Sequence, residues 1–169
     1  MKHKKSGTCK CSRCAAIAAG KTPAQADAEY QKWERENLRK HGWICHFVTA
    51  DAASPTGFNL HTHGLQENYQ HADFQIVVPL PQKVGHSILI TLADRVKAGE
   101  RFEADKKVDG VITDPDGEGL PVKLIEVTEC GRPVLRVILP DPRDKLDLGE
   151  IDDQYVKQYD KGVEREEVE

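Results

Sequence analysis

The chain has 169 residues, 38% hydrophobic and 31% charged, which suits one folded domain with a single core under a strongly solvated surface. Its 24 basic residues are outnumbered by 28 acidic ones, so the formal net charge of −4 exerts no overall attraction on nucleic-acid phosphates. No apolar run approaches the roughly 20 residues that cross a bilayer, and the basic start leads into cysteines and not into a signal-peptide core. We therefore expect a soluble, cytoplasmic protein that binds neither nucleic acid nor membrane.

The segment 1–22 has its own composition, rich in Lys, Ser, Gly and Cys and without helix or strand periodicity. Cys9, Cys11 and Cys14 follow one another closely, and such clustered thiols in a reducing cytoplasm favour metal binding over disulfides. The segment is predicted to be a zinc knuckle with a fourth ligand from elsewhere in the chain. A reduced tail that binds no metal is the alternative interpretation. The candidates for the fourth ligand are His3, His41, Cys45 and His46.

A helix is predicted from Pro23 to Lys40. Thr22 followed by Pro23 is typical of an N-cap and a first turn, and no further Gly or Pro interrupts the stretch. Its apolar positions are sparse and form one narrow stripe through Tyr30 and Trp33, so we expect this helix to lie on a surface.

From Trp43 onward the hydrophobic period changes from that of a helix to that of a strand. Strands are predicted over 43–48, 58–63, 74–80, 107–113, 122–128 and 134–139. Between the third and the fourth, Val84, Ile88, Leu92 and Val96 recur every four residues, which predicts an amphipathic helix that ends before Gly99. These elements predict an α+β fold, in which a mostly antiparallel sheet is packed by this one long amphipathic helix.

Three segments follow from this pattern. Residues 1–22 are expected to be the cysteine-rich tail or zinc knuckle, and residues 23–150 the single α+β domain. Residues 151–169 are expected to form a short helix near 152–159 and then an acidic disordered tail.

Several short motifs, taken in order, resemble those of one protein family. They are His41-Gly42-Trp43 before the first strand, Thr62-x-Gly64-Leu65, His71-Ala72-Asp73-Phe74, the helix end over 95–102 and the late strand over 134–141. Together they resemble the bacterial family of domains of unknown function numbered 4262, over about residues 38–141. The resemblance implies an α+β fold and use inside a bacterium, and it implies no activity. Two departures are Ala72, where the family commonly has Pro, and Asp147-Leu148-Gly149, where many members have Pro-Trp.

A group of polar residues follows the second predicted strand. His61 and His63 share a face because they are two residues apart on a strand, and His71 returns in the loop that also carries Glu67. We expect His61, His63 and His71 to share a polar pocket with Glu67 that binds a ligand or a transition metal. Histidines that face solvent or form hydrogen bonds to a loop are the alternative interpretation.

Two functions from different classes follow. Glycine-rich phosphate loops and nucleophile elbows are not found in the sequence, which favours a binding or interaction module, stabilised by zinc, whose partner is a protein or a small molecule. The alternative is a metal-dependent enzyme centred on His61, His63 and His71, in which the cation polarises a substrate or acidifies a water molecule.

Overall fold

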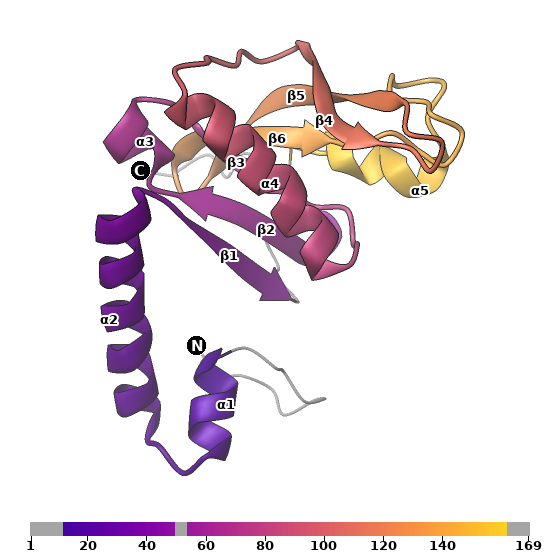
Figure 1. Ribbon diagram of the computed structural model, residues 1–169. Helices are drawn as coiled ribbons and strands as arrows, with labels where there is room; N and C mark the ends of the chain where they lie inside the picture. The colour runs from indigo at the N-terminus through magenta and orange to yellow at the C-terminus, as the bar shows by residue number, and fades with distance from the viewer. Residues whose placement is uncertain (1–11, 50–53, 162–169) are drawn as a thin grey trace, which may run out of the picture. The chain divides into compact units, whose positions relative to one another are not determined.

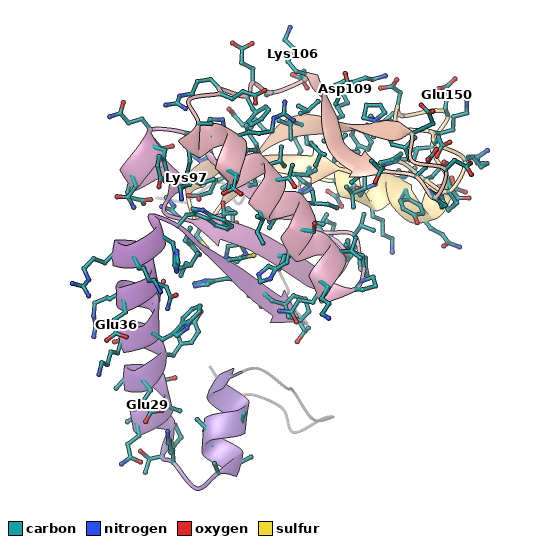
Figure 2. All side chains as sticks on the ribbon, in the orientation of Figure 1. Glu29, Glu36, Lys97, Lys106, Asp109 and Glu150 are labelled. Carbon is teal, nitrogen blue, oxygen red and sulfur yellow. The ribbon has the colours of Figure 1, made fainter. Side chains whose placement is uncertain are left out.

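The computed structural model describes residues 12–49 and 54–161, and the chain divides into two compact units, Met1–Gly42 and Trp43–Glu169. Cys9, Cys11 and the side chain of Cys14 lie outside what the structure describes, so the zinc knuckle stays a prediction. Within the described ranges, no helix combines the length and the apolar character needed to cross a membrane. The charged side chains labelled in Figure 2, such as Glu36 and Lys97, are exposed.

The first unit contains α1 (Ser12–Ala18) and α2 (Pro23–His41). Thr22 and Gln25 form a reciprocal capping box at the start of α2, because each side chain accepts a hydrogen bond from the other residue's backbone N–H. The predicted start of this helix is therefore confirmed. The sequence pattern did not predict α1, since a helix of 7 residues with small side chains is too short to show periodicity.

The second unit is built on a six-stranded sheet with the order β1-β2-β3-β6-β5-β4 (Figure 1). The strands are β1 (Ile44–Thr49), β2 (Phe58–His63), β3 (Asp73–Ile76), β4 (Lys107–Thr113), β5 (Gly119–Glu129) and β6 (Arg132–Ile138). All neighbouring pairs are antiparallel except β3 and β6, which are parallel. The α+β class and the mostly antiparallel sheet are thus confirmed.

One face of the sheet packs against α4 (Gln82–Lys97), which crosses it in Figure 1. Leu89 and Leu92 of this helix are fully buried in one cluster with strand residues such as Leu60. A Cβ atom at Gly85 would lie 2.4 Å from the Leu60 side chain, so α4 approaches β2 closely at its first turns. Val84, which the four-residue spacing assigned to the buried stripe, is 49% exposed because Gly85 takes the inward position there.

The opposite face is covered over β5 and β6 by the chain that follows β6. This chain contains α5 (Asp153–Val156) and the 3-10 helix η1 (Lys157–Tyr159). The buried Arg136 of β6 donates hydrogen bonds to the backbone carbonyls of Gln158 and Asp160, while the Gln158 side chain bonds both backbone polar groups of Leu139. The C-terminal segment is therefore held to the sheet by buried hydrogen bonds.

The turn between β2 and β3 is organised by the buried carboxylate of Asp73. This turn contains α3 (Leu65–Tyr69), entered through Gly64 with φ of 106°. Asp73 Oδ1 accepts hydrogen bonds from Thr62 Oγ1 at 2.8 Å and from the Leu65 amide at 3.1 Å, and Thr62 Oγ1 in turn accepts from the Phe74 amide. Burial raises the pKa of Asp73, although these hydrogen bonds oppose the shift.

Removal of the Asp73 carboxylate should destabilise the fold. Asp73→Ala leaves the Thr62 hydroxyl and the Leu65 amide without their buried acceptor, which should lower the free energy of unfolding by about 2–5 kcal/mol in urea titrations. Asp73→Asn keeps an acceptor oxygen at the same place and should change it by less than about 1 kcal/mol. Equal losses in both variants would contradict this role of the hydrogen bonds.

Candidate functional site

Three histidine rings meet on the face of the sheet opposite α4. His46 of β1 lies directly opposite His61 of β2 in the strand register, and His63 lies two residues further along β2. Side chains alternate along a strand, so these rings point away from the α4 face that Leu60 occupies. The ring centroids of His46 and His63 are 4.4 Å apart, and those of His61 and His63 are 4.7 Å apart. We call His46, His61 and His63 the histidine trio.

The trio has the donor set of a metal site. One ring nitrogen from each histidine lies within 4.8 Å of the other two, and the Nε2 atoms of His61 and His63 are 3.0 Å apart. Tetrahedral zinc with Zn–N bonds of about 2.0–2.1 Å separates its ligand nitrogens by about 3.3–3.4 Å. Small ring movements would therefore allow all three histidines to contact one ion.

A buried hydrogen-bond network orients His61. Its Nδ1 lies 3.0 Å from Asn59 Oδ1 and 3.6 Å from a carboxylate oxygen of Glu129, which also accepts a hydrogen bond from Asn59 Nδ2. Gln75 donates to Asn59 Oδ1 and accepts from the buried Arg136. Metal-binding histidines commonly donate the hydrogen of their other ring nitrogen to a carboxylate or carbonyl oxygen, as His61 Nδ1 can here.

The Nδ1 atom of His63 contacts a cation and not an acceptor. Arg132 Nη2 lies 3.2 Å from His63 Nδ1, and Arg132 Nη1 donates to Glu67 at 2.8 Å. Since arginine only donates, His63 Nδ1 accepts, and the hydrogen of this ring resides on Nε2, from where it is donated to His61 Nε2. Burial, together with the neighbouring His61 and Arg132, lowers the pKa of His63, so the ring is neutral near pH 7.

His71 does not join the trio, so the expected pocket of His61, His63 and His71 is wrong in its membership. The His71 ring packs against Phe74 and Phe102, and Phe74 belongs to the core beneath α4. Its Nδ1 donates to the Ala72 carbonyl at 2.7 Å, and its Nε2 accepts from the Phe102 amide at 3.0 Å. The turn through α3 brings His71 to the apolar face of the sheet. There its hydrogen bond with the Phe102 amide holds the loop after α4.

His46 takes the place expected for His71. The sequence pattern indicates His46 only as a candidate fourth ligand of the cysteine knuckle, because the contact of His46 with His61 depends on the pairing of β1 with β2. Glu67 lies at the edge of the trio, linked to it through Arg132. Cys45, another candidate fourth ligand, packs with the core under α4, and burial raises its thiol pKa to about 12, which disfavours the metal-binding thiolate.

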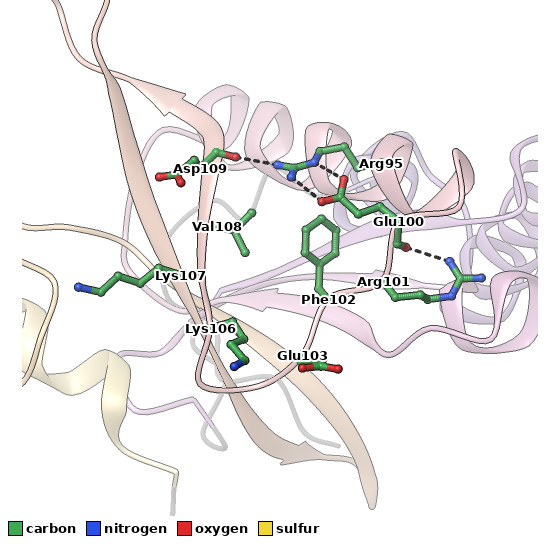
Figure 3. A pocket seen from close by; sticks show the side chains of 9 residues that line it. All are labelled: Arg95, Glu100, Arg101, Phe102, Glu103, Lys106, Lys107, Val108 and Asp109. Carbon is green, nitrogen blue, oxygen red and sulfur yellow. Dashed lines mark hydrogen bonds and ion pairs between the residues drawn. The ribbon is translucent and has the colours of Figure 1, made fainter.

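A hollow of about 450 Å³ lies between the end of α4 and β4 (Figure 3). Arg95 is paired there with both carboxylate oxygens of Glu100, donates to the Asp109 carbonyl and lies 5.0 Å above the Phe102 ring. Arg101 donates to backbone carbonyls, among them that of Glu100. The two arginines have protein partners and no histidine or cysteine lines the hollow, so the trio is the stronger candidate site.

Comparison with known proteins gives one match. Residues 37–146 match the model of a family described as Domain of unknown function (DUF4262). No curated protein and no solved structure shows a significant match to the chain. The match covers the turn at Asp73 and all three histidines of the trio.

The hydrogen bonds of His71 predict a pH dependence of stability. Burial lowers the pKa of His71 from its ordinary 6.5, and Arg101 adds to the shift, although the hydrogen bond to the Ala72 carbonyl opposes it. A protonated Nε2 also cannot accept from the Phe102 amide. Stability from such a group is present above about pH 6.5 and is lost as the pH falls through the lower pKa of the folded state. The free energy of unfolding, measured in urea, should decrease between pH 7 and pH 5, and less steeply in His71→Gln. Identical slopes in the variant and the unchanged protein would contradict this.

Proposed function

The chain belongs to the DUF4262 family of domains of unknown function, and we propose that it is a metal-dependent enzyme that binds one zinc-class ion through His46, His61 and His63. The observation that carries the proposal is the convergence of three imidazole nitrogens within 4.8 Å. Neutral imidazole suits zinc, copper, iron and nickel, and the lowered pKa of His63 favours its neutral form.

The placement of the trio supports this function. All three rings are held by two paired strands, which position ligands more accurately than loops do. His61 is only 7% exposed, so its ring is largely shielded from water. A metal ion would supply a common partner for the three rings, and the Asn59–Glu129 network would keep His61 oriented toward it.

Among the residues that the structure describes, three ligands converge, and this number supports a catalytic role for the ion. Structural zinc sites are closed by four protein ligands, whereas catalytic ones have three and keep a position for water or substrate. Three histidines around zinc lower the pKa of a bound water to about 7, which generates hydroxide at neutral pH. We therefore infer hydrolysis or hydration as the reaction class. An interaction module stabilised by zinc at Cys9, Cys11 and Cys14 is the competing proposal.

Zinc titration of the purified full chain against a chromophoric chelator tests the proposal. His61→Ala and His63→Ala should each weaken zinc binding by more than the roughly 10- to 100-fold that loss of an outer-shell partner costs. His86→Ala, which removes a histidine of α4 outside the trio, should leave the affinity unchanged. Circular dichroism should show that all three variants are folded.

The cysteines provide the decisive comparison. The triple variant Cys9→Ser, Cys11→Ser, Cys14→Ser should retain a zinc site that depends on the trio. Zinc binding that survives both histidine substitutions and disappears in the triple cysteine variant would contradict the proposed function and favour the interaction module.

A further inference from the structure

We propose that Arg132 recognises an oxyanion, a carboxylate or phosphate group, at the histidine trio, and that its contact with His63 exists only in the metal-free protein. This inference rests on the proposed function, since it assigns a substrate class to the same site. It starts from the hydrogen positions around His63.

The contact between Arg132 and His63 is incompatible with metal binding through His63 Nε2. A neutral histidine that binds an ion through Nε2 carries its hydrogen on Nδ1. The guanidinium of Arg132 cannot lose a proton and has no acceptor atom. Arg132 Nη2, now 3.2 Å from an accepting Nδ1, would face a donor in the metal-bound protein. Binding of the ion must therefore release Arg132 from the ring.

The surroundings of Arg132 allow this release. Arg132 begins β6, directly after Cys130 and Gly131, which form a tight turn with φ of 48° and 74°. Its side chain is 42% exposed, and that of its partner Glu67 is 56% exposed, so neither is held by the core. Glu67 can then accept the hydrogen on His63 Nδ1, as carboxylates commonly do behind metal-bound histidines.

A released guanidinium beside an ion with an open position favours an anionic ligand. Its planar set of donors fits two oxygens of a carboxylate or phosphate, and such charge-assisted bonds are stronger than neutral ones. The nearby Arg136 is committed to Gln75 and to backbone carbonyls, so it does not compete for this role. One oxygen of the oxyanion would bind the ion while another accepts from Arg132.

Cobalt(II)-loaded full chain provides the test, because the visible absorption of cobalt reports its coordination. The cobalt-loaded chain is titrated with acetate and with inorganic phosphate at constant ionic strength. We expect at least one of these two anions to change the visible spectrum. Arg132→Gln should weaken that binding by about tenfold or more. Arg132→Lys, which keeps the charge without the planar donors, should give a smaller loss. Lys145→Gln removes the same charge from an exposed loop residue and should have no effect.

A second measurement tests the release step. Arg132→Gln should bind zinc more tightly than the unchanged chain, because the competing contact with His63 and the nearby positive charge are both removed. Any one of three results would overturn the inference. The first is an oxyanion affinity that Arg132→Gln leaves unchanged, and the second is a lack of oxyanion binding by the unchanged chain. The third is weaker zinc binding by Arg132→Gln. If the proposed function itself fails, zinc binding is insensitive to His61→Ala and His63→Ala, a result that the zinc titration reports separately.

Discussion

The buried polar layer on one face of the sheet is the constraint that orients His61. Polar groups that leave water must find hydrogen-bond partners, and a partly satisfied network is worse than an apolar one. Here a connected series of hydrogen bonds runs from Arg136 through Gln75 and Asn59 to Glu129 and His61. It links the segment after β6 to the histidine trio across the strands between them. The orientation of His61 is thus set by hydrogen bonds of this buried layer.

The two faces of the sheet differ in the side chains that they carry. Beneath α4 the side chains are apolar, and Asp73 with Thr62 fixes the turn that leads from β2 to β3. The motifs that resemble the family, Thr62-x-Gly64-Leu65 and Asp73-Phe74, are the residues of this turn, and they are explained by its hydrogen bonds. Their residues determine how the chain turns between β2 and β3. The histidines of the candidate site lie on the other face, where His61 and His63 follow the alternation of β2.

The sequence predicted what depends on local pattern. Strand alternation placed His61 and His63 on one face, and the capping signal at Thr22 located the start of α2 correctly. The partner of these histidines was missed because the β1–β2 register, which brings His46 opposite His61, is a pairing between distant residues. His71 was misplaced because the short helix α3 reverses the chain and turns its ring toward Phe102. Local patterns do not report such reversals.

In the proposed site, nitrogen atoms of the trio, and not sulfur atoms, hold the ion. X-ray absorption at the zinc edge of the stoichiometrically loaded full chain measures this directly. We predict a first shell of nitrogen and oxygen at about 2.0–2.1 Å, with the outer-shell scattering of imidazole rings and no sulfur shell. A shell of sulfur atoms at about 2.3 Å would place the ion at cysteines and contradict the proposed site.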